Sequence, residues 1–335
     1  MNYKEQIDYS SLSTYMTCPR KFLFRYVLNL ERSGVPSIDL IFGSCWHLGM
    51  EAMYLYWHAH PDAKQRTLCE IATQAFQALW DREAAPWFDP DATFPKSPNR
   101  ARDMYWKYLE LFYETDKETT IVSAEQPFAI HVDKNLPTYV GRMDLVLERE
   151  GALEVHEHKT SKFNSPIIFT GYEASLQTEG YLTVSQIYWD ALPKIVYNQA
   201  LCQKSKVDHT RHTITKQRTA IERFIADFRY YTHEILRELE VYYRIMDDPQ
   251  WQTDRNLVLP CFRRNAGYPC TMFFRGCEYL DLCQMRNNPL TWAAKLPEGY
   301  VIHEWNPSDH ASEHKEIIDS LIGSEAPKEE VSTYE

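Results

Sequence analysis

The segment GRMDLVLEREGALEVHEHKTSK, residues 141–162, decides the fold. Apolar and polar residues alternate over 138–148 and again over 153–160, and this period of two is typical of half-buried strands. The polar stretch REGA separates the two runs and is short enough to form a tight turn. The sequence therefore predicts an antiparallel hairpin.

Two acidic residues of this hairpin are predicted to face each other. With the turn centred between Glu150 and Gly151, residues whose numbers sum to 301 lie opposite, and Asp144 and Glu157 meet that condition. Lys159 projects from the same face as Glu157. Opposed carboxylates repel unless a cation neutralises them, and carboxylate oxygens suit Mg²⁺ or Mn²⁺. The alternative is a set of outward-facing charges on an amphipathic strand.

The remaining elements indicate a mixed α/β or α+β domain. Further strands are predicted at 121–132 and 194–203. Helices are predicted at 9–30 with a break at Pro19, from Phe42 to Pro61, and at 63–83, 99–118, 171–190 and 215–247.

Composition excludes several classes of protein. The 335 residues are 44 % hydrophobic and 14 % aromatic, which is too apolar for wholesale disorder. No run approaches 18 apolar residues, so no membrane span is expected, and the N-terminus lacks a signal-peptide core. We therefore expect a cytoplasmic protein. Of the net charge of −11, residues 301–335 carry −7, and we expect them to form a mobile acidic tail.

Cysteines are concentrated near the C-terminus, where Cys261, Cys270, Cys277 and Cys283 fall within 23 residues. Four thiolates so close together suit Zn²⁺ or an iron–sulfur cluster. The paired C-x2-C knuckles common in structural zinc sites are absent from this segment. The alternative is four unrelated buried thiols, a description that also fits Cys45, Cys69 and Cys202.

Five motifs in order resemble the PD-(D/E)XK nucleases, specifically their RecB-like branch. They are SLSTYMTCPRKFLFRYV, FGSCWHLGME, GRMDLVL, EVHEHKTSK and LQTEGYL, all within residues 10–190. Glu125 also falls where the family often places a glutamate on the preceding strand. The sequence departs from the branch at Glu157, where aspartate is usual, and at His158, where an aromatic or aliphatic residue is common.

The resemblance implies a restriction-endonuclease-like fold, with a central mixed sheet flanked by helices, and a set of site residues. His47, Asp144, Glu157 and the backbone carbonyl of His158 would bind the metal. Lys159 would be the catalytic lysine, and Gln177 and Tyr181 would position the nucleic-acid strand or the hydrated metal. The residues alone favour His47 as a core histidine beside Trp46 and Met50, and the alternative for Gln177 and Tyr181 is an ordinary amphipathic helix.

The C-terminal cysteines resemble those of the AddB-type members of that branch. The resemblance implies that Cys18, Cys270, Cys277 and Cys283 hold a 4Fe–4S cluster that joins the helical N-terminal and C-terminal parts. Six residues separate Cys270 from Cys277, where two are common in that group, so Cys261 is a rival ligand.

These observations together predict one nuclease domain over residues 1–300, with a helical insertion at 60–118 and the cysteine segment at 261–283. The expected activity is Mg²⁺- or Mn²⁺-dependent hydrolysis of DNA, by an exonuclease acting on single strands in recombination, repair or phage DNA processing. A helicase or recombination protein is the expected partner. Candidate phosphate contacts are Arg20, Lys21, Arg25, Lys162, Arg263 and Arg264. The alternatives are a non-catalytic nucleic-acid-binding subunit that keeps the fold and a zinc protein without nuclease activity.

Overall fold

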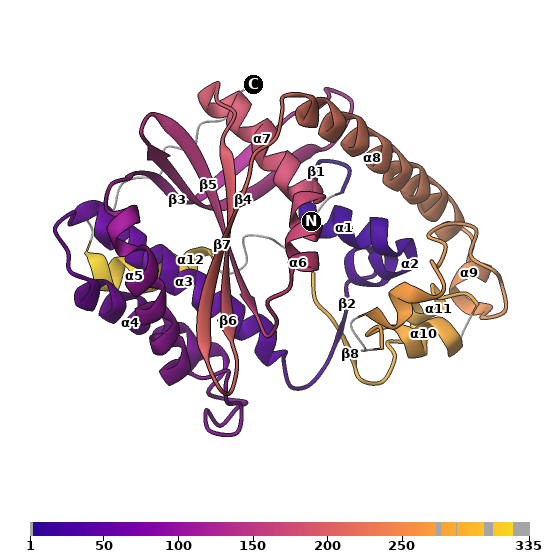
Figure 1. Ribbon diagram of the computed structural model, residues 1–335. Helices are drawn as coiled ribbons and strands as arrows, with labels where there is room; N and C mark the ends of the chain where they lie inside the picture. The colour runs from indigo at the N-terminus through magenta and orange to yellow at the C-terminus, as the bar shows by residue number, and fades with distance from the viewer. Residues whose placement is uncertain (1–2, 273–275, 286, 305–310, 324–335) are drawn as a thin grey trace.

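The computed structural model describes residues 3–272, 276–285, 287–304 and 311–323 (Figure 1). The strands are β1 (Gln6–Asp8), β2 (Leu30–Arg32), β3 (Thr120–Ile130), β4 (Thr138–Arg149), β5 (Ala152–Ser161), β6 (Lys194–Cys202), β7 (Val207–Ile214) and β8 (Tyr300–Ile302). The α-helices are α1 (Tyr9–Thr17), α2 (Pro19–Phe22), α3 (Ile38–Ala59), α4 (Gln65–Glu83), α5 (Pro98–Asp116), α6 (Pro166–Glu173), α7 (Leu176–Trp189), α8 (Thr219–Met246), α9 (Gln250–Thr253), α10 (Leu280–Met285), α11 (Thr291–Ala294) and α12 (Ala311–Ile322). A π-helical turn, η1 (Leu23–Val27), and a 3₁₀ turn, η2 (Tyr268–Cys270), complete the elements.

The central sheet has six strands and mixed directions. Its path is β1-β4-β5-β6-β7, and β3 pairs with β4. The β1–β4 and β5–β6 pairs are parallel, whereas the β3–β4, β4–β5 and β6–β7 pairs are antiparallel. This arrangement confirms the predicted mixed α/β fold with a central mixed sheet flanked by helices.

Each face of the sheet has its own hydrophobic core. On one face, α3, α4 and α5 pack around Trp46, Phe76 and Tyr105 and bury Leu145 of β4. On the other, α7 and α8 bury Val155 of β5 together with many aromatic side chains. Figure 1 shows α3–α5 on one side of the strands and α7 and α8 on the other. Strands β4, β5 and β6 are therefore largely buried on both faces, although the alternation in β4 and β5 is typical of half-buried strands.

The predicted hairpin is confirmed in type and in register. Leu145 pairs with His156 and Val146 with Val155, so opposed residues have numbers that sum to 301. The turn residues Glu150 and Gly151 have φ values of 52° and 77°. Two left-handed residues in a two-residue loop match the right-handed twist of the flanking strands, and glycine adopts this conformation without a steric cost.

Strand β4 changes partner along one edge. β3 pairs with it from Tyr139 to Glu148, whereas the other edge is shared by β1 at 138–140 and β5 at 145–149. The sheet is therefore forked at 141–144, between β1 and β5. Asp144 is the last residue of this fork.

Two segments far apart in the sequence, 19–32 and 279–302, meet beside the sheet. Pro19 begins α2 directly after α1 ends, which confirms the break predicted at that residue. β2 then pairs with β8, so Leu30 lies opposite Ile302. A third, small core of six buried residues fills this region: Phe24, Leu30, Tyr279, Leu282, Trp292 and Tyr300.

Two elements differ from the sequence prediction in the middle of the chain. The helix predicted at 171–190 is two helices, because α6 ends at Glu173 and Ser175 caps α7 by accepting a hydrogen bond from the Gln177 N–H at 3.1 Å. Strand β7 was not predicted. Its polar sequence VDHTRHTI lacks clear alternation, and its identity as a strand depends on pairing with β6 along its length.

The prediction of a mobile acidic tail over 301–335 is wrong for residues 311–322. These residues form α12, which packs against α3 and α4 because Ile317 and Ile318 are buried in their core. Charged residues cover the rest of this amphipathic helix. Residues 305–310 and 324–335 lie outside the described residues. None of the helices in the described ranges combines the length and apolar content that crossing a membrane requires.

Candidate active site

Three neighbouring strands place one acidic residue each at the same level of the sheet. On β3, Glu125 lies between Ala124 and Gln126, which pair with Leu145 and Met143 of β4, so Glu125 is opposite Asp144. The hairpin register places Glu157 of β5 on the other side of Asp144. Glu125 has a φ of 51°, which is uncommon for a residue other than glycine and typical of constrained functional positions.

The carboxylate of Asp144 has partners on a strand and on a helix. Its Oδ2 accepts a hydrogen bond from the backbone N–H of His158 at 2.7 Å and lies 3.3 Å from Nδ1 of His47. Burial would raise the pKa of Asp144, but the nearby His47 side chain outweighs it and holds that pKa well below its usual range. Burial likewise favours neutral His47, yet Asp144 raises the pKa of His47 to about 9.

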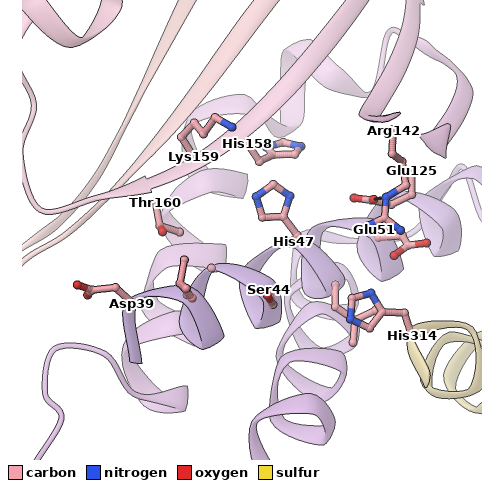
Figure 2. Close-up of a pocket in the computed structure, with 13 residues that line it drawn as sticks. Asp39, Ser44, His47, Glu51, Glu125, Arg142, His158, Lys159, Thr160 and His314 are labelled. Atoms are coloured by element: carbon pink, nitrogen blue, oxygen red, sulfur yellow. Dashed lines mark ion pairs between the residues drawn. The ribbon is translucent and has the colours of Figure 1, made fainter. Parts of the chain in front are cut away.

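Helix α3 brings His47 to the sheet because it packs closely against α5. A Cβ at Gly49 would lie 2.0 Å from the hydroxyl oxygen of Tyr105, so a larger residue would push the two helices apart. Trp46 stacks on the same tyrosine with ring centroids 4.3 Å apart. The residues on either side of His47 are thus held in the core while His47 faces the strands (Figure 2).

His47, Glu125 and Asp144 form a set of side chains that could hold a metal ion. Each offers one ligand atom, and the three atoms lie within 4.8 Å of one another. One imidazole and two carboxylates suit Mn²⁺ or Mg²⁺. Burial raises the pKa of Glu125 well above its usual range even though Arg142 opposes that shift. A cation at this point would compensate the negative charge gathered there.

Of the predicted side-chain ligands, His47 and Asp144 belong to this set and Glu157 does not, whereas Glu125 belongs to it without having been predicted as a ligand. Its signal was its place on the strand before the G-x-x-D motif. Arg142 was also missed as a site residue. Its Nε lies 2.5 Å from Oε2 of Glu125, and both residues line the cleft described below.

Glu157 is 2 % exposed and its carboxylate is held by three side chains. Its Oε2 accepts a hydrogen bond from the Tyr181 hydroxyl at 2.6 Å, and its Oε1 accepts one from Gln177 Nε2 at 3.1 Å. Lys159 forms an ion pair with the same Oε1. Gln177 also donates to the Tyr181 hydroxyl at 2.9 Å. The structure therefore brings Glu157, Lys159, Gln177 and Tyr181 into one cluster.

The His158 side chain points away from this cluster. Its ring is buried 6.2 Å from the ring of Tyr108 and 6.4 Å from that of His47, measured between centroids. Burial lowers the pKa of His158 to about 3, so the imidazole is neutral. The backbone N–H of His158 therefore binds Asp144, while the His158 side chain packs beneath α3.

An open cleft of about 360 Å³ lies over these residues. Helix α3 supplies one wall with His47 and Glu51, and the end of β5 supplies another with Lys159 and Thr160 (Figure 2). His314 of α12 reaches its rim. The cleft thus gives solvent and ligands access to His47, Glu125 and Lys159, whereas Asp144 and Glu157 do not line it.

The candidate phosphate contacts are not gathered at this cleft. Lys162 lies beside it, with its Nζ 3.1 Å from Oδ1 of Asp39 in the cleft wall. The expectation for Arg20 is wrong, because its side chain is buried and its Nε donates to the backbone oxygen of Phe262 at 2.8 Å. Three others lie near the cysteines instead. Lys21 forms an ion pair with Glu278, and Arg263 and Arg264 are exposed. Arg25 pairs with Glu31 near the β2–β8 pair.

Four cysteines share one neighbourhood next to the third core. Cys18 lies between α1 and α2, and the N–H of Cys277 donates to the Cys270 oxygen at 2.8 Å. Burial raises the pKa of Cys283 to about 11, with further contributions from the nearby thiols of the other three. These four are partly exposed, whereas Cys45, Cys69, Cys202 and Cys261 are buried.

The spacing of the four thiols bears on the group they could hold. Tetrahedral zinc, with Zn–S bonds of about 2.3 Å, would need sulfur atoms about 3.8 Å apart. Among the described residues, no three thiols lie within 4.8 Å of one another. Among the described residues, the thiols therefore do not form a compact single-ion site.

Comparison with known proteins agrees with the site. The model of the PD-(D/E)XK nuclease superfamily matches residues 6–284. Among solved structures, the crystal structure of SSO0001 is 13 % identical in sequence, with a TM-score of 0.31. The match covers 68 % of this chain and 76 % of the SSO0001 chain. One from Eubacterium rectale, named "Putative exonuclease", is 10 % identical with a TM-score of 0.39, covering 70 % and 80 %. No curated protein matches the chain. Because the family model covers most of the chain, this protein belongs to the PD-(D/E)XK nuclease superfamily.

Proposed function

We propose that this protein is a Mg²⁺- or Mn²⁺-dependent deoxyribonuclease, acting as an exonuclease on single-stranded DNA. The observation that carries the proposal is the meeting of Glu125, Asp144 and Glu157 on three adjacent strands, opposite His47 and beside Lys159. Outside a metal site, three acidic residues at one level of a buried sheet would be destabilising.

Each site residue has a proposed task. His47, Asp144 and Glu125 would hold the ion through the three atoms that lie within 4.8 Å of one another. Glu157 and the backbone carbonyl of His158 would complete its coordination. The ion would polarise the phosphate and supply a hydroxide nucleophile at neutral pH. Gln177 and Tyr181 hold the Glu157 carboxylate in place. Lys159 places a positive charge beside that carboxylate, where it would stabilise charge on a bound phosphate.

The activity is tested with labelled single-stranded and duplex DNA in the presence of Mg²⁺, Mn²⁺ or Ca²⁺. We expect Mg²⁺ and Mn²⁺ to support cleavage of the single strand. Ca²⁺ should bind but support little cleavage, because its larger and looser coordination positions the attacking water poorly. Binding without cleavage under all three ions would identify a non-catalytic nucleic-acid-binding subunit. Equal rates with all three would count against a carboxylate site.

We also propose that the protein belongs to the RecB-like branch with an AddB-type cluster, in which Cys18, Cys270, Cys277 and Cys283 hold 4Fe–4S. The shared neighbourhood and partial exposure of these thiols support the ligand set. Cys261 is a poorer ligand candidate, because it is fully buried in the larger core whereas the other four thiols are partly exposed.

The cluster is tested by anaerobic purification and metal analysis. We expect a brown protein with about four iron atoms per chain. Cys18→Ser and Cys283→Ser should bleach it, whereas Cys261→Ser and the matched control Cys202→Ser should not. A colourless protein with one zinc ion would overturn the proposal, as would an essential Cys261 with a dispensable Cys18.

The biological setting proposed with this activity is DNA recombination, repair or phage DNA processing in the cytoplasm, beside a helicase or recombination partner. The residues that support a nucleic-acid substrate are Lys159 and Arg142 in the cleft and Lys162 at its edge.

A further inference from the structure

The backbone directly after β5 is fixed by side chains. Ser161 Oγ donates to the Phe163 oxygen at 2.7 Å and accepts from the Phe163 N–H at 3.0 Å. Gln199 Nε2, from buried β6, donates to the same oxygen at 2.9 Å. Gln203 Nε2 donates to the Lys162 oxygen at 2.8 Å, and Asn164 Nδ2 bonds Thr210 Oγ1 at 2.8 Å. This short loop is therefore held from several sides.

The side chain that this loop carries is nevertheless left in solvent. Phe163 is 71 % exposed, although a phenylalanine gains free energy when it is buried. Single exposed hydrophobic residues are common on surfaces and need no explanation. A rigid backbone that presents an exposed aromatic ring is different, because a fixed ring can bind a partner without a large loss of conformational entropy.

Phe163 is also close to the cleft along the chain and through its neighbours. Lys159 and Thr160 line the cleft, and β5 ends one residue later. Lys162 reaches back to Asp39 in the cleft wall. Leu40, the next residue on α3, lines the cleft and is 73 % exposed. The cleft is therefore lined by Lys159 and Arg142 together with the acidic residues Asp39, Glu51 and Glu125, and Leu40 is an exposed apolar residue of its lining.

We propose that Phe163 is a stacking platform for an unpaired nucleobase of the strand whose phosphate occupies the cleft, with Leu40 as its apolar neighbour. A base has an apolar face that stacks on aromatic side chains whatever its sequence, whereas the bases of a duplex are already stacked and paired. Lys162 is placed to contact the phosphate between the platform and the cleft. The platform selects single strands or frayed ends. This inference rests on the proposed nuclease function.

The test measures binding separately from cleavage. A short single strand that contains one 2-aminopurine is titrated with protein in Ca²⁺, and both fluorescence quenching and anisotropy are recorded. The variants are Phe163→Ala, Phe163→Trp and, as a matched control, Tyr230→Ala, which removes an aromatic side chain 61 % exposed on α8. KM and kcat for single-stranded and duplex DNA are then measured in Mn²⁺.

We expect Phe163→Ala to weaken single-strand binding about tenfold or more and to abolish the quenching, as loss of one base–aromatic stack predicts. KM for single strands should rise by a similar factor with a smaller change in kcat, and duplex affinity should stay the same. Phe163→Trp and Tyr230→Ala should behave like the unmodified protein.

The outcomes separate this inference from the proposed function. If the protein cleaves DNA but Phe163→Ala binds and quenches like the control, the platform is refuted and the nuclease stands. If the protein binds single strands through Phe163 but cleaves nothing, the platform stands and the nuclease does not. A protein that binds no single strand at all refutes both.

Discussion

The Oδ2 atom of Asp144 accepts a hydrogen bond of 2.7 Å from the backbone N–H of His158 on the neighbouring strand. The orientation of a backbone N–H in a sheet is fixed by the strand, so the fold sets the direction of the Asp144 carboxylate. His47 approaches the same oxygen from α3. The site is thus positioned from both cores before any ion binds, and such preorganisation favours catalysis.

Asp144→Ala and Lys159→Ala should each lower cleavage by about a hundredfold or more, since charge stabilisation of several kcal/mol depends on the metal site. The fold should persist with reduced stability, because neither side chain belongs to the two hydrophobic cores but each variant loses an ion pair, with His47 or with Glu157. Rates on single-stranded DNA and thermal unfolding are compared with Glu110→Ala, a change to an exposed carboxylate on α5. Cleavage at the control rate by both variants would refute the assignment.

Glu125→Gln should weaken Mn²⁺ binding about tenfold or more, because it removes a charged oxygen from the set shared with His47 and Asp144. Mn²⁺ affinity is measured by electron paramagnetic resonance of the free ion, without substrate. Glu110→Gln is the control. Equal Mn²⁺ affinity in the two variants would show that Glu125 only pairs with Arg142.

Arg211→Met should destabilise the protein by about 3 kcal/mol, the lower end of the usual cost of breaking a buried ion pair, because Asp116 retains an ion pair with Arg149 at 3.4 Å. Arg211 donates to both oxygens of Asp116, at 2.7 and 2.9 Å, and the Asp116 side chain is 1 % exposed. Urea unfolding at pH 7 measures the change. The control, Arg244→Met, breaks an exposed pair with Glu240 and should cost less than about 1 kcal/mol. Similar losses would contradict the prediction.

Stability should fall as the pH drops from about 6.5 toward 4, in part because of His209. Burial lowers the pKa of His209 to about 4, whereas an unfolded histidine titrates near about 6.5. Between these two pKa values, His209 is protonated in the unfolded chain but not in the folded protein. The free energy of unfolding therefore falls by about 1.4 kcal/mol for each pH unit of acidification.

The variant His209→Gln isolates this contribution, because glutamine can still donate to the Met104 oxygen that His209 Nε2 contacts at 2.9 Å. Between pH 7 and pH 5 its free energy of unfolding should fall by about 2 kcal/mol less than that of the unmodified protein. Urea unfolding at both pH values provides the comparison. Parallel pH dependence would mean that His209 is protonated in the folded state.

The hairpin was predictable because it is local. Its turn fixes which residues face each other, and Asp144 opposite Glu157 follows from residue numbers alone. Gln177 and Tyr181 lie four residues apart on α7, and the sequence places them on one face without saying what that face meets. Their contact with Glu157 depends on the crossover from β5 to β6.

Glu125 was harder to predict because it depends on a longer connection. β3 and β4 are joined by seven residues, 131–137, whose conformation sets the register, and the β3–β4 pairing also shifts between Ile121 and Ser123. Helix α12 was missed for another reason. Its acidic residues dominate the composition, and only the presence of α3 and α4 makes burial of Ile317 and Ile318 favourable.

The pairing of β2 with β8 has a consequence for the order of synthesis. Leu30 pairs with Ile302 across the two strands, and its backbone oxygen accepts a hydrogen bond from the Tyr279 hydroxyl. Both partners are synthesised roughly 250 to 270 residues after Leu30. At about 5–20 residues per second, the N-terminal segment waits roughly 15 to 55 seconds on the ribosome for its partners. The region around Cys18 is therefore completed only after residues 279–302 have been made, and any metal group that bridges these segments must be inserted after that point.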